Sequence, residues 1–353
     1  MKKTLLASAI AAAAFSGAVA ASSPEPAMTT SELTEKMNTM PTFYGNIQYA
    51  YTYTDSDVNG NKRAFSDNGY STIGVTHSHA ITPDVEAFMK IELQGFGADD
   101  KATSGGISAL DEAYIGVRGD SFGRVWIGSD DTQYESLLGD YGNWVYEVAA
   151  LNTYASYTTG EGNMIQYASP SFGGLTLHAG MEIQDNGQGN EKRPYQLGVS
   201  YSMSGLTASL VMDSNDGAAD TSNENSYGVS FEYVLDALVL DAYYDMRAGV
   251  DSFTDISGGS ADQTFSFQGE EGRTQFGVMA SYNMGANTFR YSYELAETDS
   301  SSDDLSVDVM TLQALHNLSD NMYVYTEVAR RNNENGSAEE EINQLSVGGV
   351  YYF

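Results

Sequence analysis

The chain has 353 residues, with 48 acidic against 16 basic side chains, a formal net charge of -32 and no Cys. Such an acidic protein repels phosphate, which excludes nucleic acid as a partner, and the lack of Cys excludes disulfides, thiol catalysis and thiolate metal sites. A mean hydropathy of -0.32 and the absence of an 18-residue apolar run after the first twenty residues exclude a helical membrane protein, but not a β-barrel, whose strands alternate apolar and polar residues.

The N-terminus has the pattern of a secretory signal peptide. Two lysines precede an apolar run that is too short to span a bilayer, and Ala18-Val19-Ala20 fits a cleavage site. We predict a signal peptide over residues 1–20, cleaved after Ala20, and secretion of the rest of the chain to the periplasm. Residues 21–41 are polar and carry no strand pattern, so we expect a short helix or a disordered segment there.

From residue 42 to the end, apolar and polar residues alternate with a period of two. Every second residue from Val85 to Leu93 is apolar, for example, and turn residues separate such segments. We predict sixteen strands, at 42–54, 69–79, 85–95, 109–119, 124–129, 162–169, 174–183, 194–202, 205–213, 226–234, 237–246, 273–283, 286–296, 307–316, 321–331 and 342–353. Strands of about ten residues in an even number suit a membrane barrel.

The connections between these strands alternate in length. Short turns lie at 80–84, 120–123, 170–173, 203–204, 235–236, 284–285 and 317–320, and long polar loops at 55–68, 96–108, 130–161, 184–193, 214–225, 247–272, 297–306 and 332–341. Short turns at one end and long loops at the other are typical of bacterial outer-membrane barrels, and closure leaves no unpaired strand edge in lipid. We therefore predict an all-β fold over residues 42–353, a transmembrane antiparallel up-and-down β-barrel of sixteen strands.

Three sequence stretches carry a family resemblance. They are SFGRVWIG at 121–128, NMIQYASPSFGGL at 163–175 and VGGVYYF at 347–353. They resemble the turn and strand before the constriction loop, the two strands after it and the last strand of the Gram-negative general diffusion porins, the trimeric sixteen-stranded outer-membrane porins. Two features depart from that pattern: segment 21–41 is longer than usual, and Ser129 follows Gly128 where many relatives have Arg.

The resemblance implies a location and partners. It places the chain in the outer membrane as a homotrimer, in contact with membrane lipid and lipopolysaccharide. Periplasmic chaperones and the barrel assembly machinery would deliver it there. In the resembling family the final Phe is the assembly signal, and Phe353 occupies that position here.

The segment 130–161 is the most informative loop, because it is acidic and also rich in apolar residues, which favours packing against a wall. In the resembling family the third long loop folds into the lumen and narrows it, and we expect the same here. The loop has no Lys or Arg, and five of its acidic residues are predicted at the pore constriction: Asp130, Asp131, Glu135, Asp140 and Glu147. Across the pore from them we expect three basic residues of the wall, Lys90, Arg118 and Arg124, which alternation turns inward.

These charges predict a function. Opposite charges across a narrow waist create a transverse field that orients water and polar solutes, and acidic loops raise the local cation concentration. We predict a water-filled channel for the passive diffusion of ions and small hydrophilic solutes, with weak selectivity for cations. We expect no enzymatic activity, no cofactor and no bound metal.

A substrate-specific porin, for a sugar or another small polar solute, is the main alternative. Sugar channels use a track of aromatic residues in the lumen, and the plausible ones here are expected to be scattered around the barrel: Tyr44, Phe88, Tyr114, Trp126, Tyr243, Tyr323 and Tyr325. A phosphate channel would need a basic lumen. An enzymatic barrel, such as an outer-membrane protease or lipase, and a purely structural or adhesive barrel are further alternatives.

One short motif resembles a calcium site. Asp55, Asp57 and Asn59, followed by Gly60, match the first half of a calcium-binding loop. The twelfth position is Ser66 where a bidentate Glu is expected, and strands rather than helices flank the motif. A turn-forming hairpin loop is therefore the favoured interpretation, with calcium as the weak alternative.

Overall fold

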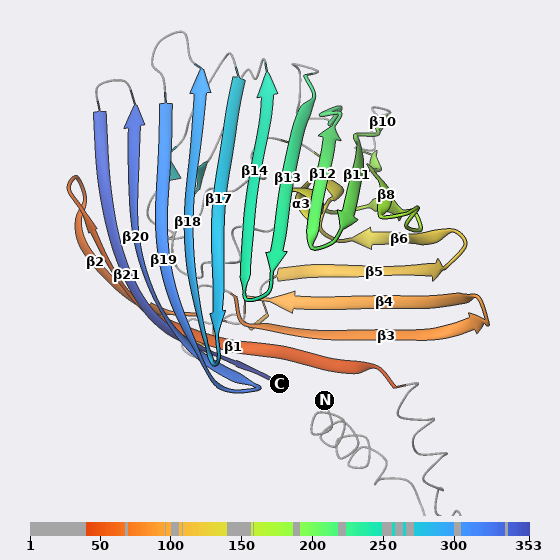
Figure 1. Cartoon of the computed structure of the whole chain (residues 1–353), viewed down its shortest axis with the longest axis horizontal. Coiled ribbons are helices and arrows are strands. Elements are labelled where there is room, and N and C mark those ends of the chain that lie inside the picture. Colours follow the sequence, from red (N-terminus) through yellow and green to blue (C-terminus); the bar gives the residue numbers. More distant parts are fainter. Residues whose placement is uncertain are drawn as a thin grey trace, which may run out of the picture.

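Sixteen antiparallel strands close into a barrel, as the sequence predicts (Figure 1). The computed structural model describes residues 40–67, 70–95, 97–99, 106–107, 109–139, 157, 159–185, 191–217, 224–248, 256–257, 264–265, 272–299, 305–335 and 338–353. The predicted signal peptide and the predicted polar segment up to residue 39 lie outside these residues. Among the described residues, no helix is long and apolar enough to cross a membrane.

The wall consists of sixteen strands in chain order. They are β1 (Thr42–Ser56), β3 (Thr72–Thr82), β4 (Val85–Gln94), β5 (Ala109–Gly119), β6 (Gly123–Ser129), β7 (Met164–Ala168), β8 (Leu175–Glu182), β11 (Tyr195–Met203), β12 (Leu206–Asp213), β13 (Ser226–Leu235), β14 (Leu238–Ala248), β17 (Gly272–Met284), β18 (Asn287–Asp299), β19 (Leu305–Ser319), β20 (Met322–Asn335) and β21 (Ala338–Tyr352). The loops carry helix α3 (Gln133–Leu138) and the short strands β2 (Gly60–Ser66), β9 (Gln184–Asp185), β10 (Glu191–Lys192), β15 (Ile256–Ser257) and β16 (Thr264–Phe265).

The first and last strands join to close the barrel. Strand β1 pairs along one edge with β21 and along the other with β3 and β2. Where the start of β1 meets the C-terminus, the Phe353 amide donates to the Gly45 carbonyl over 3.0 Å, and the Gly45 amide donates to the Phe353 carbonyl over 3.2 Å. Each wall strand therefore has a neighbour on both sides, which satisfies the backbone in lipid.

The two faces of the wall have opposite character. In β1, Gln48 and Thr52 face inward and are buried, whereas Phe43 and Tyr51 face outward and are 58% and 47% exposed. The same alternation recurs around the barrel, with large apolar side chains exposed on the outer face. An outer surface of this kind is stable in contact with hydrocarbon and not in water, because apolar area is exposed and polar groups are enclosed.

Two of the predicted long loops are largely strand and a third is half strand, and this corrects the sequence analysis. The 55–68 loop contains β2, which pairs with the second half of β1, from Ala50 to Ser56. The 297–306 and 332–341 loops are mostly the ends of β18 to β21, which leave only residues 300–304 and 336–337 between them. The polar composition of these segments predicts loops, but a strand that extends beyond the membrane contacts water on both faces and needs no apolar side.

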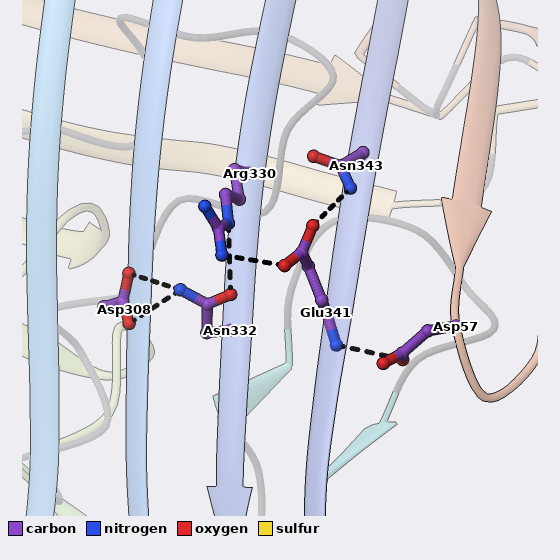
Figure 2. A network of polar contacts seen from close by, with 6 residues as sticks. All are labelled: Asp57, Asp308, Arg330, Asn332, Glu341 and Asn343. Carbon is purple, nitrogen blue, oxygen red and sulfur yellow. Dashed lines mark hydrogen bonds and ion pairs between the residues drawn. The ribbon is translucent and has the colours of Figure 1, made fainter.

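A polar network covers the outer surface of these strand extensions (Figure 2). Arg330 pairs with Glu341 over 2.7 Å, and Asn332 donates to both carboxylate oxygens of Asp308 over 3.1 Å. The amide of Glu341 donates to Asp57 Oδ1 over 3.0 Å, which ties the β1–β2 turn to β21. These contacts run across β19, β20 and β21 and replace the apolar residues that the same strands expose lower down.

The wall is uneven in height. Strands β6, β7 and β8 have seven, five and eight residues, whereas β19, β20 and β21 have 15, 14 and 15. In Figure 1 the long strands of the C-terminal third are blue and the short ones yellow and green. We call β6–β8 the low wall; the long third loop starts at its edge, after β6.

Candidate functional site

The third long loop enters the barrel as helix α3. This helix lies against the inner face of β8 and of β11 to β13, beside β12 and β13 in Figure 1. Thr132 caps its first turn, accepting a hydrogen bond from the Glu135 amide over 3.2 Å, and Gly139 ends it with a positive φ of 91°. The described part of this loop therefore folds into the lumen, as expected.

Two glycines of the wall make room for α3. Leu137 and Leu138 are buried against β11 and β13, where Gly198 and Gly228 face inward. A Cβ on Gly228 would lie 2.5 Å from Leu138 Cδ2, and a Cβ on Gly198 would overlap the Leu137 side chain. The absence of side chains at these two positions lets the helix lie directly on the sheet. We call this inner face of β11–β13 the docking wall.

Neutral polar groups fix the helix backbone to the docking wall. The Tyr134 amide donates to Gln196 Oε1 over 2.9 Å, and Ser230 Oγ donates to the Leu137 carbonyl over 2.6 Å. At the root of the loop, Gln166 Nε2 donates to the Asp131 carbonyl over 2.8 Å. A six-residue helix has few hydrogen bonds of its own, so these side chains satisfy backbone groups that would otherwise be buried without partners.

The predicted constriction acids have different surroundings. Asp130 lies at the root of the loop and accepts a hydrogen bond from the Trp126 indole over 2.6 Å, while Asp131 is exposed. Glu135 is carried on α3 and buried, where Tyr157 donates to its carboxylate over 3.4 Å. The remaining two predicted acids, Asp140 and Glu147, lie outside the described residues.

Burial changes the acidity of Asp130. Loss of contact with water, followed by the nearby charge of Glu112, raises the pKa of the Asp130 carboxyl to about 6, against the smaller opposing effects of the Trp126 hydrogen bond and of Arg124. This carboxylate is therefore half protonated in mildly acidic solution. It is a charge at the root of the third long loop that pH can remove.

The three predicted basic residues lie together on β4, β5 and β6. Lys90 pairs with Glu112 and, over 3.5 Å, with Glu92, and Arg118 pairs with Glu86 over 2.6 Å. Arg124 lies directly opposite Arg118 in the strand pairing. Since Asp130 follows β6 and is held by Trp126, it shares this section of wall with the bases, whereas Glu135 is carried to the docking wall. We call the inner face of β4–β6 the charged wall.

Arg124 is held by aromatic rings rather than by a carboxylate. Its guanidinium carbon lies 4.1 Å from the ring centroid of Trp126, 4.8 Å from that of Phe88 and 5.6 Å from that of Tyr114. Among the described residues it forms no ion pair, in contrast to Lys90 and Arg118. Cation–π attraction and stacking thus fix a charged group in the lumen.

Asp111 is a lumen residue that the sequence analysis missed. Glu92 pairs with Glu112, but the next pair is Leu93 with Leu110, so Asp111 is the extra residue of a β-bulge. Its carboxyl interacts electrostatically with Glu92, Glu112 and Lys90, all of which face the lumen. Strict alternation places Asp111 on the lipid side, and no signal in the sequence marks the bulge.

The lumen aromatics are not scattered, and this prediction was wrong. Six of the seven lie on one continuous arc of neighbouring strands that runs from β20 through β21, β1, β3, β4 and β5 to β6: Tyr323, Tyr325, Tyr44, Phe88, Tyr114 and Trp126. Only Tyr243, on β14, lies elsewhere. The closure of β1 onto β21 brings residues from both ends of the chain together, which a linear sequence does not reveal.

The calcium-like motif forms a hairpin, which confirms the favoured interpretation. Asp55 pairs with Asn61 across the hairpin, and residues 57–59 form its turn. The Asp57 carboxylate accepts from the Glu341 amide, and Asn59 Nδ2 donates to Glu340 Oε1 over 2.8 Å. Within the described part of the chain, no group of three or more His, Asp or Glu side chains is placed to hold a metal ion.

A family model for Gram-negative porins matches residues 7–336 of the chain. The chain belongs to the Gram-negative porin family. It is similar to a monosaccharide porin of a Halomonas species and to the major outer membrane protein of Halomonas elongata, with 28% identity over 398 aligned residues and 100% of both chains covered in each case. The family and the fold make this porin an outer-membrane channel.

Solved structures share the architecture of this porin. An anion-selective porin from Comamonas acidovorans superposes with a TM-score of 0.69 at 17% identity, over 89% of this chain and 99% of that one. The trimer form of OmpT from Vibrio cholerae superposes with a TM-score of 0.61 at 13% identity, over 89% and 99% of the two chains. At these identities the likeness shows a common barrel fold and does not extend to ion preference.

Proposed function

We propose that this porin is a water-filled channel for the passive diffusion of ions and small hydrophilic solutes, with a weak preference for cations. The observation that carries the proposal is the charge balance of the charged wall and the loop root. Three bases, Lys90, Arg118 and Arg124, are outnumbered there by five carboxylates, Glu86, Glu92, Asp111, Glu112 and Asp130. An excess of negative charge along a narrow passage raises the local concentration of cations and lowers that of anions.

The pairing pattern supports the same direction. Lys90 and Arg118 are each bound to carboxylates of neighbouring strands, so little of their charge is available to attract a passing anion. The bulge adds Asp111 to this section of the lumen without adding a base. The preference is expected to be weak, because mobile ions screen these charges over about 8 Å at physiological salt.

Reversal potential in planar bilayers tests this proposal. With purified protein and a KCl gradient, we expect a zero-current potential whose sign indicates cation preference, and a magnitude that falls as the mean salt concentration rises. A potential of the opposite sign would show that the bases dominate and would overturn the proposed selectivity. Correctly folded protein without conductance would overturn the diffusion function altogether.

A preference for a neutral sugar is a second candidate function. The aromatic arc from β20 to β6 is the specific observation in its favour, because ring faces in a lumen suit the apolar faces of sugars. A relative of this porin is named a monosaccharide porin. Saturable reduction of the ion current by millimolar glucose would support this candidate, and currents independent of glucose would leave general diffusion alone.

We also propose that the porin is a homotrimer and that the low wall lies at its subunit contact. A strand needs about nine to eleven residues to span a bilayer, and β6 and β7 have seven and five. An apolar groove of 830 Å³ lies on the outer face of β4 to β8, lined by outward isoleucines: Ile91, Ile115, Ile127, Ile165 and Ile183. A second protein surface fits such a low, apolar section better than lipid of full thickness.

Cysteine crosslinking tests the contact, because the natural chain has no Cys. Ile127→Cys, in the groove, should give crosslinked oligomers in outer membranes, whereas Leu240→Cys, exposed on β14, should not. Oligomers from Leu240→Cys alone would place the contact elsewhere, and a monomeric mass for the extracted protein would contradict the trimer.

The route to the membrane completes the proposal. We propose that cleavage after Ala20 precedes delivery by periplasmic chaperones, that Phe353 serves as the signal for the barrel assembly machinery, and that the mature trimer contacts lipid and lipopolysaccharide. N-terminal sequencing of the mature protein should begin at Ala21, and another first residue would correct the cleavage site. Deletion of Phe353 should lower the amount in the outer membrane, and an unchanged amount would contradict its role.

A further inference from the structure

Three aromatic rings surround the guanidinium of Arg124, and Trp126 is buried beneath it. Phe88 and Tyr114 meet edge to face with centroids 6.2 Å apart, and with Trp126 they confine the guanidinium. Tyr114 and Trp126 are the central residues of β5 and β6, and Phe88 lies near the short-turn end of β4. Tight packing of planar groups leaves the guanidinium little freedom to move, and a ligand would not need to order it.

The donors of Arg124 are available to a ligand. Among the described residues, its guanidinium makes no hydrogen bond and no ion pair, and its buried Nε is without an acceptor. Lys90 and Arg118, on the neighbouring strands, are each bound to carboxylates. A guanidinium presents a planar set of N–H donors that can bind two oxygen atoms of one molecule at once.

An acceptor lies at the edge of the Trp126 ring. The indole N–H donates to Asp130 Oδ2 over 2.6 Å, and among the described residues no donor contacts Oδ1, which can accept from a hydroxyl. The donor set of Arg124 lies over the face of the Trp126 ring, and the acceptor on Asp130 lies at its edge. Ring faces with a few fixed donors and acceptors are the features by which protein sites bind small polar molecules that have an apolar face.

The charge of the surroundings selects between ligand classes. A carboxylate solute would be attracted by Arg124 but repelled by Asp130 and by the excess of acids around Lys90, namely Glu92, Asp111 and Glu112. An uncharged ring with neighbouring hydroxyls avoids this repulsion. It can still use the guanidinium, the carboxylate and the aromatic faces.

We propose that Arg124, Asp130 and the rings of Phe88, Tyr114 and Trp126 form a binding subsite for an uncharged monosaccharide in its pyranose form. The subsite rests on the proposed channel function and gives it a preferred solute. Solutes would pause there on their way through the pore, which raises their flux at low concentration. Binding must stay weak, since release from the channel requires fast dissociation.

Block of the ion current in planar bilayers tests the subsite. With full-length mature protein, glucose should reduce the open-channel current in a saturable way at millimolar concentrations. Gluconate, which has a carboxylate, and sorbitol, which has no ring, should have weaker effects. In Arg124→Gln the half-blocking glucose concentration should rise at least about tenfold, the change expected from loss of a hydrogen bond to a charged group. Arg330→Gln removes the same charge from the outer surface, away from the subsite, and should raise that concentration less than about twofold.

Each outcome decides the proposal. An unchanged half-blocking concentration in Arg124→Gln, or stronger block by gluconate than by glucose, would overturn the subsite. If Arg124→Gln fails to form channels, Asp130→Asn is the second variant, and it should also weaken block by glucose. A wild-type channel that conducts ions but is indifferent to glucose overturns the subsite alone. Folded wild-type protein that does not conduct overturns the channel function, and the subsite with it.

Discussion

The docking wall and the charged wall use the same inward positions of a strand for opposite purposes. On β11 and β13, Gly198 and Gly228 leave space that α3 fills, and neutral side chains such as Gln196 and Ser230 hold its backbone. On β4 to β6 the inward positions carry charged and aromatic residues, most of them half-buried or exposed, with Trp126 buried. Helix α3 lies on glycines and neutral side chains, while the carboxylates of Glu182 and Asp213 hold the end of the same loop at Gly160 and Thr159. We expect solutes to be selected at the charged wall.

This division leads to separate expectations for the two walls. Changes on the docking wall should alter the size of the pore, and changes on the charged wall should alter its choice of ion. A change on one wall that produced the effect expected of the other would show that the division is wrong.

The largest effect is expected from filling the two glycine positions. In Gly198→Val/Gly228→Val, the new side chains would overlap Leu137 and Leu138 and force α3 off the wall. Overpacking costs about 1–3 kcal/mol per site, which is comparable to what a six-residue helix gains from docking. Single-channel conductance should rise, as measured in planar bilayers.

A third glycine provides the control. A Cβ on Gly349 would lie 3.5 Å or more from its neighbours, so Gly349→Val should leave conductance unchanged. If the double variant conducts like the wild type while remaining folded, α3 does not limit the pore.

The next effect concerns pH and the Asp130 carboxyl. Because its pKa is raised to about 6, it loses its charge as the pH falls through about 6, and cation preference should decrease over that range. The folded protein binds this proton more tightly than the unfolded chain does, so the buried carboxylate lowers stability above pH 6, and this penalty is relieved between about pH 6 and pH 4. Reversal potentials recorded from about pH 8 to pH 5 measure the change.

Asp130→Asn provides the matched control for pH. The variant should have a lower cation preference at neutral pH and a smaller step near pH 6. A step of full size in Asp130→Asn would assign the titration to another group.

A smaller effect is expected from Lys90. In Lys90→Gln, Glu92 and Glu112 lose their cation, and the reversal potential should shift further toward cations. Arg330→Gln removes an equal charge from the outer surface, where Arg330 pairs with Glu341 in the network of Figure 2. It should leave selectivity unchanged, because the outer surface does not line the pore; equal shifts in both variants would contradict a local role for the charged wall.

The smallest effect is expected from one tether of α3. Ser230→Ala removes the donor to the Leu137 carbonyl and leaves a buried acceptor unsatisfied, which costs about 1–3 kcal/mol. The loop should stay in place, with greater current noise and a slightly lower melting temperature. Ser202→Ala, at an exposed position on β11, is the control and should change neither; an equal change in both would remove the special role of Ser230.

The regular parts of this molecule could be predicted from its sequence, and the irregular ones could not. Strict alternation and turn residues identify sixteen strands, and they turn Lys90, Arg118 and Arg124 inward. The ends of β18 to β21 that border residues 300–304 and 336–337 could not be predicted, because strands with water on both sides carry no apolar face. The inward position of Asp111 could not be predicted, because a β-bulge interrupts the alternation of inward and outward residues at that point.

Contacts between distant parts of the chain also could not be predicted from the sequence. Glycines at 198 and 228 are visible in it, but their fit to Leu137 and Leu138 depends on how the loop folds back. The aromatic arc depends on the closure of β1 onto β21. The pairing of strands that are adjacent in the chain follows from the local sequence pattern. Closure of the barrel and docking of α3 depend on the three-dimensional fit between residues far apart in the chain.

The sign of the zero-current potential across a KCl gradient, measured at neutral pH with the wild-type protein in planar bilayers, tests the central claim most directly. The excess of carboxylates on the charged wall predicts a weak preference for K⁺ over Cl⁻. A preference for Cl⁻ would mean that Arg124 and its neighbours control the passage, and would contradict the account given for the charged wall.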